Sequence, residues 1–259
     1  MKRHRMKTYG KFATVYDQLG ADRFSADMVD YTFKIMRRFK VNATCGLDLC
    51  CGTGTALRLF ADRRLAMTGL DQSAAMLREA RKKLRGKKIK LCCQSLPRFE
   101  IRNDKTGRRL QRFDIITCFY DSLNYLQNAS QLRAAFRSVY RHLAPGGWFV
   151  FDMNTPEALK VLWGSQIWGG VKDDLAWIWR NRYYENECCA ECTTTFFIKS
   201  GKHWKRFDEL HSEKAYDNRE VRRWLREAGY TVKGFYRCFS FAKPTARTCR
   251  ICVVARRPD

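Results

Sequence analysis

The sequence predicts an α/β protein: a mostly parallel sheet flanked by helices, with an antiparallel β lid inserted late in the chain. Two observations favour this architecture. Between about residues 24 and 152, apolar runs of strand length alternate with amphipathic segments of helical period, as in consecutive βαβ units. Between residues 159 and 215 this alternation stops, and the chain becomes rich in β-branched and aromatic residues, which is typical of antiparallel strands.

The same patterns predict the elements in chain order. Amphipathic helices are expected at residues 24–39, 56–60, 74–84, 131–143 and 219–227, and helical spacing of aromatic residues also runs through 9–19. Core strands are expected at residues 45–49, 65–70, 89–93, 113–119, 148–151, 231–241 and 248–256, with a polar turn at 103–111. Lid strands are expected at residues 176–184, 191–198 and 203–216. The chain is accordingly expected to divide into an N-terminal helical cap (1–40), a ligand-binding core (41–156), the β lid (157–216) and the C-terminal part of the core sheet (217–259).

A strand, glycine turn, helix and second strand between residues 44 and 71 predict a nucleoside site. The first apolar run carries Asp48 near its end and leads into a turn of small residues with Gly52 and Gly54. The second apolar run ends on Asp71. Glycines let ligand atoms approach the backbone, amides at a helix start face an anionic group, and an acid after the second strand binds ribose hydroxyls.

The turn departs from the dinucleotide fingerprint, which needs a third glycine for close helix–strand packing. Counted from Gly52 and Gly54, that place is occupied by Leu57, and counted from Cys50 it is occupied by Thr55. A carboxylate just before the turn, here Asp48, repels a pyrophosphate but suits an ammonium group. This favours S-adenosylmethionine over a nicotinamide dinucleotide.

Four motifs in order resemble those of the class I S-adenosylmethionine-dependent methyltransferases: LDLCCGTG at 47–54, GLDQS with ML at 69–77, FDIITC at 113–118 and HLAPGG at 142–147. The resemblance implies a Rossmann-like, seven-stranded sheet whose last strand is antiparallel, with S-adenosylmethionine as cofactor. It implies cofactor contacts at nine positions: Asp48, Cys50, Gly52, Gly54, Asp71, Gln72, Ser95, Leu96 and Tyr120.

The adenine end of this site departs from the family. An Asp that accepts from the adenine amino group commonly stands where this chain has Ser95. The serine is therefore expected to act as a weaker acceptor, unless Gln94 reaches the ring instead, and the backbone amide of Leu96 remains available to read it.

The loop after the fourth strand is expected to border the transferred methyl group, since ligands bind beyond the carboxyl ends of parallel strands. Its sequence at 120–126, YDSLNYL, resembles a loop of a small-molecule branch of the family. Asp121 or Asn124 is expected to hold an amine or hydroxyl of the acceptor, with helix capping as the alternative role for the acid. Asp152 and Asn154, at the end of the fifth strand, are further substrate-side candidates.

His211 and Tyr16 complete the expected catalytic set with Asp121. His211 stands where the branch has a histidine on its last lid strand, and its pKa near neutrality suits a general base or substrate donor, although a structural histidine fits as well. In the family, a stretch similar to 13–17 closes over the cofactor. Tyr16 is expected either to face the sulfonium with its ring or to pack the amphipathic segment.

The composition bounds the remaining possibilities. The formal net charge is +24, and residues 81–90 carry seven basic residues and no acid, which suits either nucleic acid or a solvated surface. Most of the twelve cysteines lie in apolar runs, which favours a reducing cytoplasm. No apolar run approaches the roughly 18 residues that span a bilayer, so no membrane is expected. Cys188, Cys189 and Cys192 lack a second pair at zinc-site spacing, so no metal is expected.

The function expected from these observations is methyl transfer to a nitrogen, oxygen or carboxylate of a small molecule. Two alternatives stay open. An RNA methyltransferase would use the basic surface, and a non-catalytic protein would bind the adenosyl ligand without turnover. The acceptor and the oligomeric state are not predicted.

Overall fold

The computed structural model describes residues 9–103 and 109–259. Seven strands form the core sheet: β1 (Cys45–Leu49), β2 (Ala66–Asp71), β3 (Lys90–Cys93), β4 (Phe113–Cys118), β5 (Leu143–Asn154), β10 (Thr231–Arg237) and β11 (Arg250–Arg256). Their order in the sheet is β10-β11-β5-β4-β1-β2-β3. The five neighbouring strands β3, β2, β1, β4 and β5 pair in parallel, while β11 pairs antiparallel with both β5 and β10. The predicted Rossmann-like sheet is confirmed.

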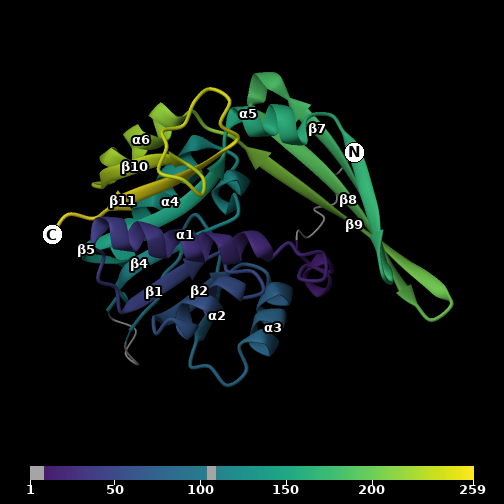
Figure 1. Ribbon diagram of the computed structural model, residues 1–259, viewed down its shortest axis with the longest axis horizontal. Coiled ribbons are helices and arrows are strands. Elements are labelled where there is room, and N and C mark those ends of the chain that lie inside the picture. The colour runs from purple at the N-terminus through teal and green to yellow at the C-terminus, as the bar shows by residue number, and fades with distance from the viewer. Residues whose placement is uncertain (1–8, 104–108) are drawn as a thin grey trace.

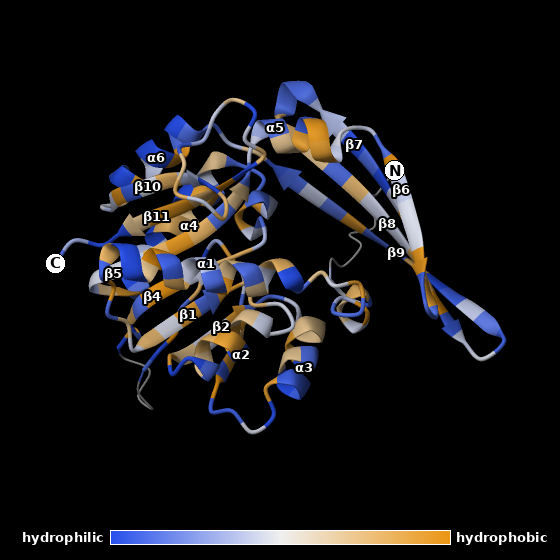
Figure 2. Cartoon of the chain, viewed as in Figure 1, coloured by the Kyte–Doolittle hydropathy of each residue, from blue (hydrophilic) through white to orange (hydrophobic). Residues whose placement is uncertain are grey.

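Helices cover both faces of this sheet (Figure 1): α1 (Arg23–Phe39), α2 (Thr55–Asp62), α3 (Ala74–Lys83), α4 (Ala129–His142) and α6 (Asn218–Glu227). Apolar side chains of α1, α2 and α3 form one buried cluster, and those of α4 and α6 form a second cluster on the other face. Strands β1 and β4 are buried over almost their whole length, as expected for central parallel strands. Figure 2 shows the apolar residues concentrated in the central strands and on the inner sides of the helices.

One glycine sets the packing distance between α2 and β2. A Cβ atom on Gly69 would lie 2.5 Å from Leu57 Cδ1 and 2.9 Å from Cys51 Sγ. Only glycine therefore lets α2 and the turn before it sit this close to β2. The close approach brings the glycine turn to the carboxyl end of β2, where the site is built.

The lid is a separate antiparallel sheet that extends away from the core (Figure 1). It contains β6 (Ile167–Lys172), β7 (Leu175–Tyr184), β8 (Cys189–Ser200) and β9 (His203–Lys214), in the order β6-β7-β8-β9. The chain enters it through the short helix α5 (Pro156–Ala158) and a π-helical turn (Leu159–Trp163). The N-terminal segment lies between α3 and the lid, where the Phe12 ring stacks on the Phe196 ring at 4.8 Å between centroids.

Three differences from the predicted elements have physical causes. The helical spacing at residues 9–19 yields only one 3₁₀ turn, η1 (Phe12–Thr14), because the backbone leaves the helical region at Val15, with φ −117° and ψ 0°. Strand β6 was not predicted because two glycines interrupt its pattern and its outer residues are exposed. The strand expected at 231–241 ends at Arg237, since Phe239 adopts a positive φ of 63°.

The other expected helices and strands are confirmed within two residues of the predicted bounds, except that β5 begins at Leu143, five residues before its predicted start, and ends three residues after its predicted end. Part of the polar turn expected at 103–111 lies outside the described residues, and the division into four units stays a prediction. Among the helices that the structure describes, none has the length and apolar character needed to cross a membrane.

Candidate functional site

The glycine turn after β1 is held open by the acid at the end of β2. Asp71 Oδ2 accepts the backbone N–H of Gly52 at 2.9 Å, and Asp71 Oδ1 accepts that of Ser73 at 2.7 Å. Positive φ angles at Cys50 (55°), Gly52 (54°) and Gly54 (80°) curl the turn away from the sheet. Burial raises the pKa of Asp71, and the two amide hydrogen bonds counteract this. A carboxylate has about four acceptor positions, so two remain for a ligand's hydroxyl groups.

Asp48 is the second buried acid at this edge of the sheet. It is 2% exposed on β1, and its Oδ1 accepts the hydroxyl proton of Thr117 at 2.7 Å. Burial raises the pKa of Asp48 to about 7, and the charge of Asp71 adds to the effect. Within the described residues, no Lys or Arg side chain forms an ion pair with it. A cationic group on a ligand would therefore stabilise its ionised form.

A cavity at the carboxyl ends of β1, β2 and β4 brings together six of the nine predicted cofactor residues: Asp48, Cys50, Gly52, Asp71, Gln72 and Tyr120. Gly54 is instead the N-cap of α2, where a Cβ atom would lie 3.1 Å from Leu84 Cδ1 of the loop after α3. Ser95 and Leu96 follow β3 outside the cavity lining, and Ser95 is exposed.

The alternative adenine acceptor, Gln94, is already engaged. Its Nε2 donates to the carbonyl of Glu100 at 2.9 Å, and its Oε1 accepts the backbone N–H of the same residue at 2.9 Å. Both ends of the side-chain amide are therefore used to shape the loop after β3.

The N-terminal segment closes this cavity through a polar network. The hydroxyl of Thr53 donates to Asp17 at 2.7 Å and that of Thr55 donates to Asp22 at 2.9 Å. Lys83 Nζ lies 2.7 Å from Asp17 Oδ2 and 3.5 Å from Asp22 Oδ2. The ammonium group of Lys83 on α3 thus links the N-terminal segment to the glycine turn.

A second cavity of about 220 Å³ lies between the core and the lid. It shares four lining residues with the first cavity: Tyr9, Tyr16, Tyr120 and Tyr125. Its walls are largely aromatic, and its polar side chains include those of Asp121, Asn181, His211, Glu213 and Arg250. Two ligands in the two cavities would meet at the four shared tyrosines.

His211 lies on β9 in the wall of this second cavity and is 4% exposed. Its Nδ1 lies 2.9 Å from the hydroxyl of Tyr125, which is 2.8 Å from the hydroxyl of Tyr9. Its Nε2 is 3.7 Å from Glu209 Oε2 and makes no hydrogen bond within the described residues. Burial lowers the pKa of His211 to about 4, so the imidazole is neutral at pH 7.

Asp121 belongs to a buried ionic cluster behind the tyrosines. Asp152 accepts the backbone N–H groups of Tyr120 at 2.7 Å and Asp121 at 3.0 Å, which holds both residues at positive φ. Arg250 Nη1 donates to Asp152 at 2.7 Å, and its Nη2 donates to Asp121. Burial raises the pKa of Asp152 to about 6 despite the guanidinium. Arg250 also packs on the rings of Phe24 and Tyr120.

Known proteins with the same architecture decide the family. The chain matches the family described as "Methyltransferase domain" over residues 47–147. The solved structure of an S-adenosylmethionine-dependent methyltransferase from Clostridium acetobutylicum ATCC 824 has a TM-score of 0.83 and 29% identity, covering 96% of this chain and 98% of that one. The chain belongs to the class I S-adenosylmethionine-dependent methyltransferases. Its cofactor is S-adenosylmethionine, and the unpaired acid Asp48 beside the glycine turn fits the ammonium group of that molecule.

Two curated relatives extend the comparison of this methyltransferase. A protein of Geobacillus sp. (strain WCH70) with a provisional methyltransferase name is 28% identical over 253 residues, covering 96% of this chain and all of the relative. The dTDP-3-amino-3,4,6-trideoxy-alpha-D-glucopyranose N,N-dimethyltransferase of Streptomyces venezuelae is 32% identical over 142 residues, covering 54% of this chain and 56% of that protein.

Sequence reasoning placed Asp121, His211 and Tyr16 in this methyltransferase's site, and the structure brings all three to the second cavity. It missed Arg250 and Glu213. Glu213 could have been predicted, because residues two apart on a strand share a face and Glu213 follows His211 by two positions.

The three neighbouring lid cysteines, Cys188, Cys189 and Cys192, do not converge on a common point. No group of three or more His, Cys, Asp or Glu side chains suited to a metal ion occurs in the part of the chain that the structure describes.

Proposed function

We propose that this methyltransferase transfers a methyl group from S-adenosylmethionine to an amine nitrogen of a small molecule bound under the lid. The observation that carries the proposal is the pair of cavities that share Tyr9, Tyr16, Tyr120 and Tyr125. One cavity has the acids and glycines suited to the cofactor, and the other is enclosed by lid aromatics. The shared tyrosines border the position where a methyl group would pass from one ligand to the other.

In the first cavity, Asp48 binds the ammonium group of the cofactor's amino acid and Asp71 binds the ribose hydroxyls. Gly52 lets the ligand approach the backbone, and the ring of Tyr16 faces the sulfonium, whose positive charge favours the aromatic face. When bound, S-adenosylmethionine supplies an electrophilic methyl carbon on a positively charged sulfur. Cys50, Gln72 and Tyr120 complete the wall of the site.

In the second cavity, the protein's contribution is positioning and exclusion of water. Transfer requires the accepting atom about 3–3.5 Å from the methyl carbon and in line with its bond. The rings of Phe12, Trp163, Trp168 and Trp179 enclose the acceptor and strengthen its polar contacts by keeping water away. Asp121 and His211 hold polar groups of the acceptor near the tyrosine wall.

Two facts support an amine as the accepting group. The acidic side chains facing the second cavity and lying just behind it, Asp121, Asp152 and Glu213, outnumber the single guanidinium of Arg250, so a cation is favoured there. The Streptomyces venezuelae relative is named for N,N-dimethylation of an amino sugar nucleotide.

The test compares acceptors and blocks the pocket. The purified protein is incubated with S-adenosylmethionine and paired small acceptors, amino sugars and their hydroxyl counterparts, and S-adenosylhomocysteine is quantified. Turnover of amines and not of hydroxyl counterparts is expected. Thr194→Trp fills the cavity from β8 and should abolish turnover while leaving S-adenosylhomocysteine affinity unchanged. Thr193→Trp, on the outer face of the same strand, is the matched control and should retain turnover.

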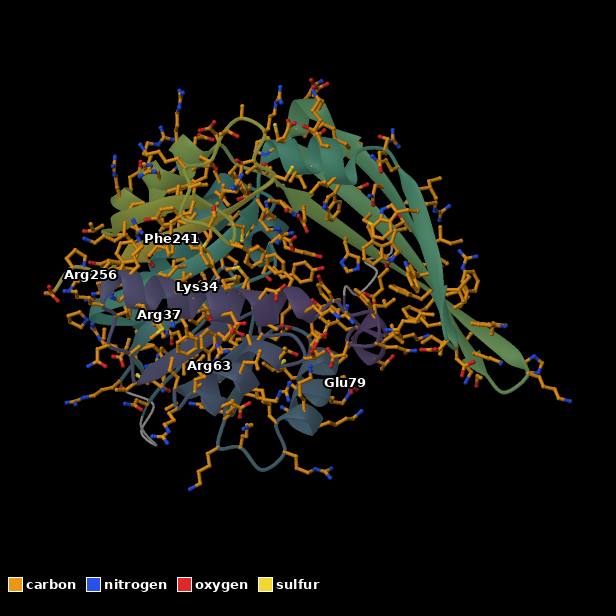
Figure 3. All side chains as sticks on the ribbon, viewed as in Figure 1. Lys34, Arg37, Arg63, Glu79, Phe241 and Arg256 are labelled. Carbon is orange, nitrogen blue, oxygen red and sulfur yellow. The ribbon has the colours of Figure 1, made fainter. Side chains whose placement is uncertain are left out.

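RNA is the second candidate acceptor, favoured by the net charge of +24. Charged side chains project outward around the core and the lid (Figure 3), where they are available to phosphates. RNA methylation that falls steeply with salt and survives Thr194→Trp would replace the small-molecule proposal. Cofactor binding with no turnover on any acceptor would instead favour a non-catalytic binding protein.

A further inference from the structure

We propose that Glu213 is the residue that binds the acceptor's ammonium group and takes its proton before methyl transfer. The inference rests on the proposed function, an amine acceptor under the lid, and assigns the key step to a residue other than His211.

Strand β9 presents Glu213 to the second cavity from its core end. Glu209, His211 and Glu213 alternate onto the inward face of this strand. Glu213 is 1% exposed, and its Oε2 accepts the amide N–H of Asn154 at 2.8 Å. This contact fixes the carboxyl group at the junction of lid and core, beside Asp121 and close to the tyrosine wall.

The charges around Glu213 leave it without a cation of its own. Asp121 and Asp152 approach from the core, and each is bonded to Arg250, so the one guanidinium is shared by the two aspartates. Within the described residues, Glu213 forms no ion pair. Burial, with the charges of Asp121 and Asp152 added, raises the pKa of Glu213 well above its usual range, although Asn154 and Arg250 counteract this. The remaining titratable groups that face it come from the lid and the tyrosine wall: Cys192, His211, Tyr9, Tyr120 and Tyr125.

Unpartnered polar atoms in the same cavity point independently to a polar ligand. Buried side-chain polar atoms in native proteins nearly always have a hydrogen-bond partner. Trp179 Nε1, Asn181 Oδ1 and His211 Nε2 are buried and have none among the described residues, and all three side chains line this cavity. The trio offers a donor, an acceptor and an imidazole nitrogen, which together suit hydroxyl groups beside the amine. Glu213 supplies the charge that such a ligand's ammonium requires.

The proton balance follows from these positions. As the ammonium, R–NH₃⁺, enters, the protonated carboxyl of Glu213 first releases its proton to solvent; the ammonium then transfers one N–H proton to the resulting carboxylate, which leaves a neutral amine and a neutral carboxylic acid. This exchange is favoured where burial disfavours both charges. The freed nitrogen lone pair then forms the N–C bond to the donor's methyl carbon, while the C–S bond electrons stay with sulfur.

His211 fits this role less well. The imidazolium that it would become is disfavoured by burial, as its lowered pKa shows. Its Nδ1 is engaged with Tyr125, so only Nε2 faces the acceptor. His211 is therefore a positioning residue for the acceptor's hydroxyl groups.

The experiment measures binding of D-glucosamine and D-glucose, which differ by one amine, to the protein saturated with S-adenosylhomocysteine. Calorimetry at pH 6 in two buffers of different ionisation enthalpy gives both affinity and proton release. We expect glucosamine to bind at least tenfold more tightly than glucose and to release about one proton, because the protonated carboxyl and the ammonium together carry two protons and the bound pair keeps one. Glu213→Gln should remove both the preference and the proton release while glucose affinity stays unchanged.

Two further variants complete the design. Glu213→Asp keeps a carboxyl group one methylene further away and should restore part of the preference. Glu185→Gln removes an exposed lid carboxylate that pairs with Lys160 and should behave as the wild type. Glu213→Gln is expected to fold, because the amide oxygen can still accept from Asn154 and a costly buried acid is removed.

Amine preference and proton release that survive Glu213→Gln in a folded protein would overturn the role of Glu213 and leave the proposed function intact. If neither sugar binds the wild type while S-adenosylhomocysteine does, the proposed acceptor class fails, and the assignment of Glu213 fails with it.

Discussion

The carboxylate of Asp71 accepts the backbone N–H of Gly52 at 2.9 Å, so the acid at the end of β2 shapes the glycine turn that follows β1. The same carboxylate accepts the N–H of Ser73 at the start of α3. One side chain therefore joins the two loops that border the cofactor cavity. Its proposed contact with the ribose uses the acceptor positions that these amides leave.

Asp71→Asn is expected to weaken cofactor binding at least about tenfold, because a neutral amide replaces a charged acceptor of several hydrogen bonds. The thermal midpoint of the ligand-free protein should also fall, since one of the two backbone amides loses its partner. Calorimetry with S-adenosylhomocysteine and thermal melting measure the two effects. Asp62→Asn, which removes an exposed acid paired with Lys87, is the control. Unchanged cofactor affinity would refute the ribose contact.

Asp48 should make both stability and cofactor affinity depend on pH. Its pKa of about 7 in the folded protein exceeds the ordinary 3.8, so between these values the folded state keeps a proton that the unfolded state releases. Ionising the buried Asp48 therefore lowers the free energy of unfolding. This loss of stability is absent below pH 4, grows as pH rises and is complete above pH 7, where it reaches on the order of 4 kcal/mol at 1.36 kcal/mol per pKa unit.

Asp48→Asn is therefore expected to stabilise the ligand-free protein more at pH 8 than at pH 5 by about 3 kcal/mol in urea unfolding. The same variant should lose most affinity for S-adenosylhomocysteine at both pH values, because the ammonium loses its counter-ion. In the wild type, that affinity should fall as pH drops below 7. A variant no more stable at pH 8 than at pH 5, relative to the wild type, would contradict the buried, unpaired carboxylate.

The core strands could be predicted from the sequence because the burial that packs them against helices also requires runs of apolar residues. Strand β4 lies between β1 and β5 with helices on both faces, so four of its six residues are apolar and the run is readily recognised in the sequence. Strand β6 was not predicted because its Gly169 and Gly170 are needed to make room for the backbone and ring of Trp177 on the neighbouring strand. A contact between strands of this kind leaves no local sequence pattern.

The cofactor side of the site was predictable from local motifs, while the acceptor side depends on contacts between distant segments. Arg250 reaches Asp121, 129 residues away in the sequence, because β11 inserts antiparallel beside β5 and sets Arg250 opposite Asn154. Likewise, Glu209 binds the N–H of Tyr9 at 2.6 Å across 200 residues. The topology of the fold brings these residues together, and their spacing in the sequence does not predict the contacts.

Arg250→Gln should destabilise the protein by about 3 kcal/mol at pH 7.5, because it leaves the carboxylates of Asp121 and Asp152 buried without a cation. Without the guanidinium the pKa of Asp152 rises above its present value of about 6. The folded variant then binds a proton more readily than the unfolded chain, so lowering the pH to 5.5 should recover part of the loss. Urea unfolding at both pH values measures this.

The control for that experiment is Arg223→Gln on α6, where an exposed guanidinium pairs with Glu220 and Glu227. Exposed ion pairs contribute about 0–1 kcal/mol, so this variant should change stability little and without pH dependence. Equal losses in the two variants would contradict the buried cluster as the origin of the effect.

Glu209 is expected to hold the N-terminal segment against the lid. Its carboxylate accepts the backbone N–H groups of Tyr9 at 2.6 Å, Gly10 at 2.9 Å and Phe12 at 3.1 Å. Glu209→Gln keeps one acceptor oxygen but loses the charge that strengthens all three bonds. Trypsin should therefore cleave after Lys11 several-fold faster in the variant, and mass spectrometry of the fragments measures it.

The same release should speed dissociation of S-adenosylhomocysteine, because the segment from Tyr9 to Asp22 also covers the cofactor cavity through its contacts with Thr53 and Thr55. Asp208→Asn is the matched control, since that acid pairs with Arg206 on the other face of the strand and, among the described residues, does not bond to the N-terminal amides that Glu209 holds. Saturation with S-adenosylhomocysteine should slow the cleavage in both proteins, because the bound ligand contacts the closed segment. Cleavage that is equally fast in the Gln variant and the control would mean that the lid does not secure this segment.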